Sequence, residues 1–148
     1  MYRPYVISIA LLMVLLFGAC KKSDSPTWAF CTDCTIEDWA GSYAGEGDYY
    51  NGADDKTELD IPTIVVIENI SGNLLKTTIT AEDKLSTSFI SSKDDDNHYY
   101  SIAGNGKSLD LSLSKKGSDF KLSGTVKLFH INKDTVVVDH SISFDVFR

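Results

Sequence analysis

Residues 98–128 read HYYSIAGNGKSLDLSLSKKGSDFKLSGTVKL, and this stretch decides the fold. Apolar and polar side chains alternate on both sides of two glycine-containing turns, which is typical of half-buried antiparallel strands. Asn105-Gly106 is a strong signal for a two-residue hairpin loop. Such a loop sets Tyr100 opposite Leu111, so the two strands are expected to share one apolar face.

The next turn extends this face into a third strand. Lys116-Gly117 predicts a tight turn that sets Leu113 opposite Phe120. Apolar side chains then occupy every second position of the following strand, over 118–131, apart from one glycine. A hairpin therefore becomes a meander whose strands all contribute to the same apolar face.

A third turn at 132–134 leads into the last strand, over 135–147. We expect a three-residue loop, which sets Leu128 opposite Val138, because a two-residue loop would place apolar side chains opposite polar ones. The last two strands are then about 13 residues long, well beyond the usual five or six. Long, coiled strands favour a barrel or a strongly bent sandwich.

Two histidines fall on the inner face of these last two strands. The same register sets His140 opposite Val126, four residues from His130. At about 3.3 Å per residue the two rings lie roughly 13 Å apart, too far to share an ion. We expect two separate, hydrogen-bonded histidines and no metal site.

The first half of the chain predicts four more strands. Their approximate ranges are 38–50, 61–70, 75–81 and 85–91. A two-residue loop at Gly72-Asn73 gives a register in which Val65 and Ile67 point outward. The sequence thus predicts an all-β fold, an antiparallel up-and-down meander of about eight strands, closed as a barrel or, as the alternative, bent into a β-sandwich.

The first of these strands carries a short motif. Residues 39–45 read WAGSYAG, with Trp39, Gly41, Tyr43 and Gly45 at alternating positions. Together with about eight antiparallel strands, this W-x-G-x-Y-x-G run resembles the lipocalin-like, or calycin-like, lipoproteins of Bacteroidota over residues 35–148. The resemblance implies a single up-and-down barrel domain, 35–148, with one closed end and one open mouth.

The N-terminal segment predicts a secretory signal over residues 1–19. A positive start is followed by a helical run of apolar residues over 6–18, too short to span a bilayer comfortably. Small residues then precede Cys20, and this resembles the lipobox of bacterial lipoproteins, in which the cysteine receives a lipid. Lys21 stands where an aspartate favours inner-membrane retention in such lipoproteins, so the resemblance implies the outer membrane. Residues 20–34 form the lipidated tether.

The tether contains a C-x-x-C motif, Cys31 and Cys34. Two thiols so close together in an oxidising envelope are expected to form a structural disulfide. A redox site and a share in a zinc site are the alternatives. The first lacks the expected helix start in a βαβ unit, and the second needs two more ligands.

Composition narrows the classes of function. The chain has 14 basic and 21 acidic residues and a net charge of −7, which argues against nucleic acid as a partner. The sequence has no serine elbow, phosphate loop or metalloprotease motif. We therefore expect a protein that is not an enzyme and that needs no cofactor and no metal.

Tyrosines near the strand ends suggest where a ligand would bind, since a ring with a polar tip suits the rim of a pocket. The predicted ligand-binding residues are Tyr43, Tyr49, Tyr50 and His130. We expect a binding module for a small apolar or amphipathic ligand, with its mouth at the end that holds loop 51–57. The alternative is an envelope scaffold with a filled barrel, whose protein partner contacts the outward-pointing Val65 and Ile67.

Overall fold

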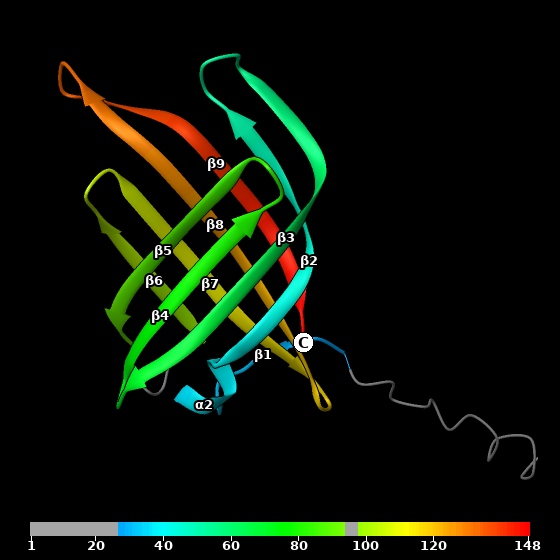
Figure 1. The fold of residues 1–148 in the computed structure, drawn as a ribbon. Coiled ribbons are helices and arrows are strands. Elements are labelled where there is room, and N and C mark those ends of the chain that lie inside the picture. Colours follow the sequence, from blue (N-terminus) through cyan, green and yellow to red (C-terminus); the bar gives the residue numbers. More distant parts are fainter. Residues whose placement is uncertain (1–26, 94–97) are drawn as a thin grey trace, which may run out of the picture.

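The computed structural model describes residues 27–93 and 98–148, which fold into one strongly curved antiparallel sheet and a single turn of helix (Figure 1). The elements are β1 (Ala29–Phe30), α2 (Ile36–Trp39), β2 (Gly41–Asn51), β3 (Lys56–Ser71), β4 (Leu74–Ala81), β5 (Leu85–Ser92), β6 (Tyr99–Gly104), β7 (Lys107–Lys116), β8 (Asp119–Asn132) and β9 (Thr135–Phe147). The predicted signal helix and Cys20 lie outside the described residues.

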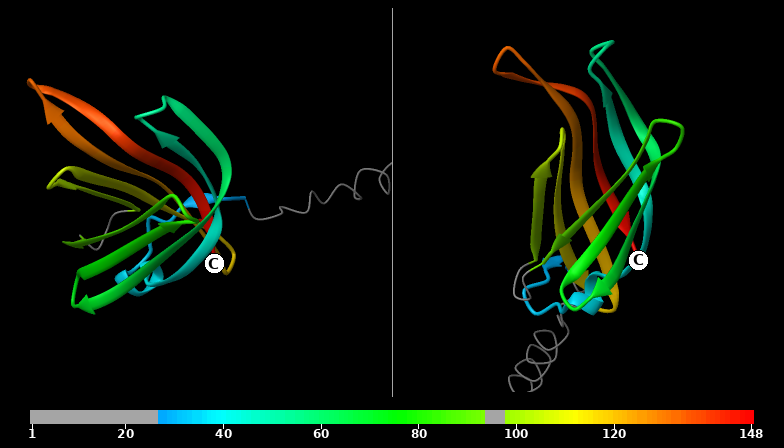
Figure 2. Two further views of the ribbon diagram at one scale, coloured as in Figure 1. Left: turned by 45° about the horizontal axis from the view of Figure 1, so that its top comes forward. Right: turned by 60° about the vertical axis from the view of Figure 1, so that its left-hand side comes forward.

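The strands follow an up-and-down order with one interruption. Along the sheet the order is β1-β7-β8-β9-β2-β3-β4-β5, and β6 also pairs with β7. β9 pairs with β2, so the last strand of the meander lies beside its first long strand. β5 and β6 share no ladder in the described part of the chain, and the sheet curls without closing (Figures 1 and 2). The all-β antiparallel meander is confirmed, with nine strands instead of eight, whereas a closed barrel is not.

Side chains bridge the seam between β5 and β6. The ammonium group of Lys107 donates a hydrogen bond to the carbonyl of Ser88 (2.5 Å) and lies 4.7 Å from the centre of the Phe89 ring. The hydroxyl of Tyr100 donates to the carbonyl of Ser91 (3.3 Å). The two strand edges are therefore held near each other by side chains in place of a backbone ladder.

The turn of helix α2 lies at the lower end of the sheet in Figure 1. As the Thr35-x-x-Asp38 spacing suggests, the carboxylate of Asp38 accepts hydrogen bonds from the backbone N–H of Thr35 (2.8 Å) and from its hydroxyl (3.3 Å). Trp39, the last residue of α2, and Tyr43 on β2 are both fully buried. Arg148 donates to the carbonyl of Asp38 (2.9 Å), which ties the C-terminal end of the chain to this turn. No helix among the described residues is long and apolar enough to cross a membrane.

The core occupies the inner face of the sheet. Its fully buried members include Leu75 and Ile79 on β4, Leu109, Leu111 and Leu113 on β7, and Leu122, Val126, Ile142 and Val146 on β8 and β9. These side chains come from alternating positions, as one buried face requires. Along most of its length the curved sheet is therefore filled by its own side chains.

The first predicted turn in the second half is confirmed. Tyr100 lies opposite Leu111 and Ile102 opposite Leu109. Asn105 and Gly106 both adopt positive φ, +52° and +72°, as a type I′ loop requires.

The second turn forms one residue later than predicted. Gly117 and Ser118 are the loop residues, and Leu113 lies opposite Leu122 and not opposite Phe120. Gly117 adopts φ +62° at the first loop position, where a type II′ hairpin needs a glycine. The shift is by two residues in the partner strand, so the inward and outward faces are unchanged.

The third turn was predicted wrongly. It has two loop residues, Lys133 and Asp134, both at positive φ, which is the type I′ geometry. A β-bulge between Leu128 and Phe129 on one strand and Val138 and His140 on the other then shifts the register. Because the bulge takes up one extra residue of β9, Leu128 lies opposite His140 and the inner face continues without interruption.

A second β-bulge makes the register between β3 and β4 differ from the predicted one. The Gly72-Asn73 loop is present, but the pairing of β3 with β4 shifts by one residue between Asn69 and Ser71. Val65 and Ile67, predicted to point outward, are consequently buried in the core, and Ile64 is half exposed in their place. The prediction that Val65 and Ile67 form an outward-facing partner surface is therefore wrong.

The segment that precedes α2 joins the sheet. β1 pairs with β7, and the N–H of Cys31 donates to the carbonyl of Leu113 (3.0 Å). Cys31 and Cys34 form a disulfide and are both buried. The disulfide therefore fixes the chain where it enters the domain.

Candidate ligand-binding site

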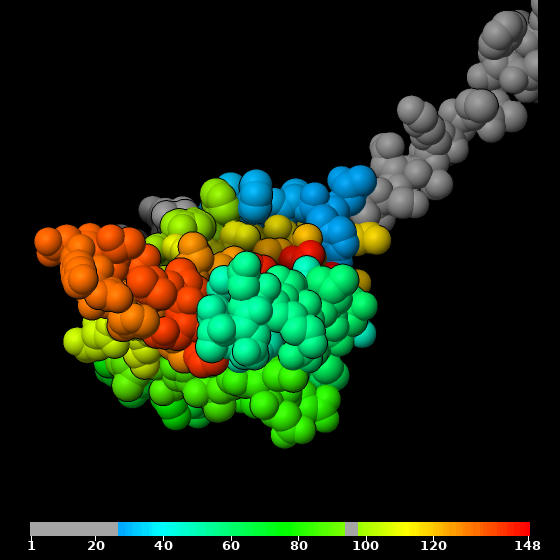
Figure 3. Space-filling model, turned by 90° about the horizontal axis from the view of Figure 1, so that it is seen from above, coloured from blue at the N-terminus to red at the C-terminus, as the bar shows by residue number. Residues whose placement is uncertain are grey.

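A hollow of about 470 Å³ lies at the upper end of the sheet, between the β2–β3 turn and the β8–β9 hairpin. It is lined by Gly52, Ala53, Leu128, His130, Val137, Val138, Asp139 and His140. Figure 3 looks onto this end of the molecule, with the β8–β9 hairpin in orange and the β2–β3 turn in teal. We call this hollow the end pocket.

One wall of the end pocket depends on a glycine. The N–H of Gly52 donates to the carbonyl of Asp139 (2.7 Å), which joins the β2–β3 turn to β9. A Cβ atom at position 52 would collide with the carbonyl oxygen of Val138, a backbone atom. Only a residue without a side chain lets the turn approach β9 this closely.

The opposite wall depends on the bulge in β9. Nδ1 of His130 lies 2.8 Å and 3.0 Å from the two carboxylate oxygens of Asp139. Both side chains are about half exposed at the rim. An imidazole hydrogen-bonded through Nδ1 keeps Nε2 as its second hydrogen-bonding position, which is available to a ligand.

The base of the pocket holds the second histidine. Nδ1 of His140 lies 2.8 Å from the hydroxyl of Tyr49, and the two rings are nearly parallel with centroids 5.9 Å apart. Tyr49 is buried and His140 is partly exposed. The hydrogen bond with Tyr49 therefore orients the ring of His140, and Tyr49 does not itself line the hollow.

The remaining predicted ligand-binding residues lie at opposite ends of the sheet. Tyr50 belongs to the same end, where its hydroxyl donates to the carboxylate of Asp55 (3.0 Å), and this hydrogen bond raises the pKa of Tyr50. Tyr43 is fully buried at the lower end, and its hydroxyl donates to the carbonyls of Asp38 (3.1 Å) and Trp39 (3.0 Å). The structure thus brings His130 to the end pocket, places Tyr49 and Tyr50 next to it, and leaves Tyr43 far from it.

Sequence reasoning missed Asp139 as the partner of His130, and it missed His140 as a second histidine in the lining of the same pocket. The predicted register set His140 four residues away from His130, opposite Val126, whereas it lies opposite Leu128, two residues away. The sequence did not reveal the β-bulge. A three-residue loop at 132–134 accounts for the alternation in these strands equally well, so the prediction used that loop in place of a two-residue loop with a bulge. Of the histidine, cysteine, aspartate and glutamate side chains in the described ranges, no three come close enough to hold a metal ion.

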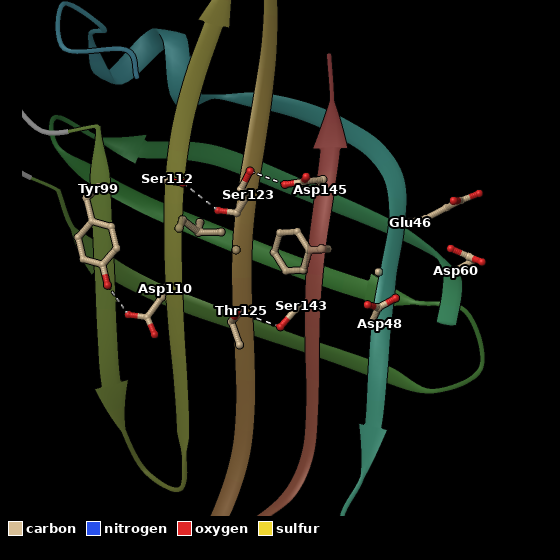
Figure 4. Close-up of a pocket in the computed structure, with 14 residues that line it drawn as sticks. Glu46, Asp48, Asp60, Tyr99, Asp110, Ser112, Ser123, Thr125, Ser143 and Asp145 are labelled. Carbon is tan, nitrogen blue, oxygen red and sulfur yellow. Dashed lines mark hydrogen bonds between the residues drawn. The ribbon is translucent and has the colours of Figure 1, made fainter. Parts of the chain in front are cut away.

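A second hollow, of about 560 Å³, crosses the outer face of β6, β7, β8, β9 and β2 (Figure 4). It is lined mainly by acidic and hydroxyl side chains, among them Glu46, Asp48, Asp60, Tyr99, Asp110, Ser123, Ser143 and Asp145. Many of these groups already bind one another: Tyr99 and Ser101 donate to Asp110 (2.8 and 2.7 Å), and Ser123 donates to Asp145. This trough is a solvated polar surface whose hydrogen bonds are largely satisfied internally.

A third hollow, of about 600 Å³, lies between the disulfide segment 32–37 and the Gly72-Asn73 turn. Its lining consists mostly of loop residues with small or charged side chains. Of the three hollows, the end pocket alone combines aliphatic walls with a few converging polar groups, which is the usual composition of a small-molecule site.

Comparison of the chain with known protein families, with curated proteins and with solved structures finds no match.

Proposed function

We propose that this chain is a lipid-anchored lipoprotein of the outer membrane, and that it binds a small amphipathic ligand in the end pocket without catalysing a reaction on it. The observation that carries the proposal is the pocket itself. Its volume of about 470 Å³ lies within the usual range of ligand sites, about 300–1,000 Å³. Leu128, Val137 and Val138 supply an apolar wall, and His130 and His140 supply polar groups beside it.

The arrangement of the ends supports this function. β1, which lies within the proposed tether, pairs with the lower part of β7, whereas the end pocket lies at the upper end (Figure 1). A lipid at Cys20 would therefore hold the lower end near the membrane. The pocket would then open away from the bilayer, where a ligand from the surrounding solution reaches it.

The resemblance to lipocalin-like lipoproteins is also part of the proposal. A sheet in up-and-down order, with β9 beside β2 and α2 at one end, has the layout of such a barrel with a single ladder missing. We propose that the chain is an open variant of that architecture. Its ligand would then lie at the mouth and not deep in the interior, because core side chains fill the inner face.

An envelope scaffold remains the second candidate, and one observation favours it. Ile64, Ile70 and Ile90 are 49%, 50% and 60% exposed on β3 and β5, which is unusual for isoleucine on a sheet. If this face contacts an envelope protein, a photo-crosslinker at position 64 captures one partner reproducibly in cells, and filling the end pocket does not affect the capture.

Filling the end pocket should weaken the binding of a small amphipathic probe. We expect 8-anilinonaphthalene-1-sulfonate, an apolar ring system with one anionic group, to bind the native chain with a rise in its fluorescence. Ala53→Trp places a large side chain at the pocket wall and should weaken binding about tenfold or more, a loss of about 1.4 kcal/mol. Fluorescence titration measures both affinities.

The matched control is the same substitution outside the pocket. Ala103 is exposed on β6 and is not part of the pocket lining, so Ala103→Trp should leave the affinity unchanged. Equal weakening by the two variants, or a native chain that binds no probe, would contradict the proposed site. Native mass spectrometry of the purified protein is the companion measurement, since a ligand retained from the cell would appear as an added mass.

The lipid anchor is tested separately. Cys20→Ser should abolish incorporation of an alkyne fatty acid and should release the protein from the membrane fraction, because the thioether can no longer form. Click labelling of cells that express the native and variant chains measures this. A serine variant that is still labelled and still sediments with membranes would show that the anchor is assigned wrongly.

A further inference from the structure

Three aromatic side chains at the lower end of the sheet are turned to solvent. Trp28 is 38% exposed, Phe30 is 62% exposed and Phe147 is 46% exposed. The rings of Trp28 and Phe147 lie 5.8 Å apart, and Phe30 stacks on His98 with a centroid distance of 4.6 Å. We call Trp28, Phe30 and Phe147 the aromatic base.

The aromatic base is built by two ends of the chain. Trp28 and Phe30 come from β1 and the residue before it, at the edge of β7, and Phe147 is the last residue of β9. Figure 2 shows β1, the β7–β8 turn and the C-terminal end gathered at this side of the molecule, away from the β8–β9 hairpin. Exposed aromatic side chains that cluster in this way usually mark a contact surface.

The charged groups around the aromatic base are mostly cations. The ammonium group of Lys116 lies 6.0 Å from the centre of the Trp28 ring, Lys115 is 3.9 Å from a carboxylate oxygen of Asp33, and Arg148 stacks on Phe120 at 4.5 Å. The whole chain, by contrast, has a net charge of −7. A surface with aromatic rings and an excess of cations fits the headgroup zone of a bilayer, where tryptophan and lysine side chains are favoured.

The length of the tether brings this surface to the membrane. Seven residues separate Cys20 from Trp28, and even fully extended the eight steps of chain span at most about 28 Å. A lipid at Cys20 therefore keeps the aromatic base close to the bilayer at all times. Because the lipid already holds the domain at the membrane, a second, weak contact by the aromatic base costs little additional entropy.

We propose that the aromatic base rests on the bilayer surface, with Trp28 inserted among the lipid headgroups and acyl-chain ends. This inference rests on the proposed lipid anchor. The contact fixes the orientation of the domain, so that the end pocket points away from the membrane. Because the exposed rings supply apolar area for burial, the contact forms on a neutral bilayer, and the surrounding cations strengthen it where anionic lipids are present.

The two tryptophans of the chain provide the measurement. The full chain is expressed in bacteria, purified from membranes and reconstituted in phosphatidylcholine vesicles that contain lipids brominated near the headgroup end of the acyl chain. Trp28 is expected to be quenched because bromine is within reach, whereas Trp39, which is fully buried in the core, is not. The native chain should therefore lose part of its tryptophan emission, and the loss should be the same at low and high salt.

Trp28→Phe is the matched variant, since it removes the exposed reporter and leaves the buried one. Its emission should be unaffected by the brominated lipids. A native chain whose emission is also unaffected would overturn the proposal. So would a quenching that persists in Trp28→Phe, because it would come from Trp39 and hence from a disrupted core, or a self-association of the chain in detergent that Trp28→Phe abolishes.

The intact mass of the same preparation separates this proposal from the lipid anchor. A chain that carries acyl groups at Cys20 but shows no quenching contradicts the aromatic base alone. A chain without acyl groups contradicts the anchor and, with it, the membrane contact.

Discussion

Leu111→Ala should lower the free energy of unfolding by about 2–5 kcal/mol, the usual cost of removing a buried leucine side chain. Leu111 is 1% exposed on β7, opposite Tyr100 on β6 and Gly124 on β8. A Cβ built at Gly124 would come within 3 Å of the side chains of Leu111 and Phe144, so these two fill the space that the glycine leaves. Urea denaturation of the native and variant domains measures the difference.

The control for this prediction is one residue away. Asp110 lies on the outer face, where its carboxylate accepts hydrogen bonds from the hydroxyls of Tyr99 and Ser101. Asp110→Ala should cost under about 0.5 kcal/mol because solvent replaces these exposed contacts. Equal losses at positions 110 and 111 would mean that the inward and outward faces of β7 are assigned wrongly.

The domain should also lose stability in alkaline solution, and the buried phenol of Tyr43 should contribute the largest part of the loss. Burial raises the pKa of Tyr43 to about 12, from an ordinary value of 10. Between these values the unfolded chain releases the proton while the folded chain retains it, so stability is complete below pH 10 and falls as the pH rises toward 12. The full loss is about 3 kcal/mol, from about 1.4 kcal/mol for each of the two units of pKa difference, and most of it is reached by pH 12.

Denaturant titrations at pH 9 and pH 12 test this in three chains. Tyr43→Phe costs some stability at pH 9, because the carbonyls of Asp38 and Trp39 lose a donor, but its further loss at pH 12 should be much smaller than that of the native chain. Tyr50→Phe changes an exposed phenol whose pKa is raised chiefly by its hydrogen bond to Asp55, so this variant should keep most of the alkaline loss. If the Tyr43 and Tyr50 variants respond to pH alike, Tyr43 does not carry the effect.

The fold was predictable where one local rule determined the geometry. Asn105-Gly106 admits essentially one hairpin loop, and the pairing of Tyr100 with Leu111 follows from it. Alternation alone also identified the strands, because a buried face imposes a period of two. What alternation does not determine is whether a ladder is interrupted, since one extra residue on one strand leaves the pattern on each side intact.

Two of the three wrong registers come from such interruptions, whereas the one at Gly117 comes from the choice of loop residues. The bulge near Ile70 reverses the faces of β3, and the bulge at Asp139 brings His140 to a position two residues from His130. The second of these also explains the incomplete prediction of the site. His130 and the turn at Gly52 were placed at the correct end from strand parity, whereas the neighbours of His130 depend on a bulge whose residues have no distinctive chemistry.

Because β5 and β6 share no ladder, the folding of the chain depends on the ladder that joins the two halves of the sheet elsewhere. The strands from β2 to β5 and those from β6 to β9 form two meanders of local hairpins, which close quickly because their partners are near in sequence. The ladder between β2 and β9 joins them, and it pairs Ala44 with Phe147 across almost the whole domain. Because β9 is the last strand, this ladder cannot form until nearly all of the chain is available. Docking of the two meanders is therefore expected to limit the folding rate, and the β2–β9 amides to gain protection from hydrogen exchange after those within each meander.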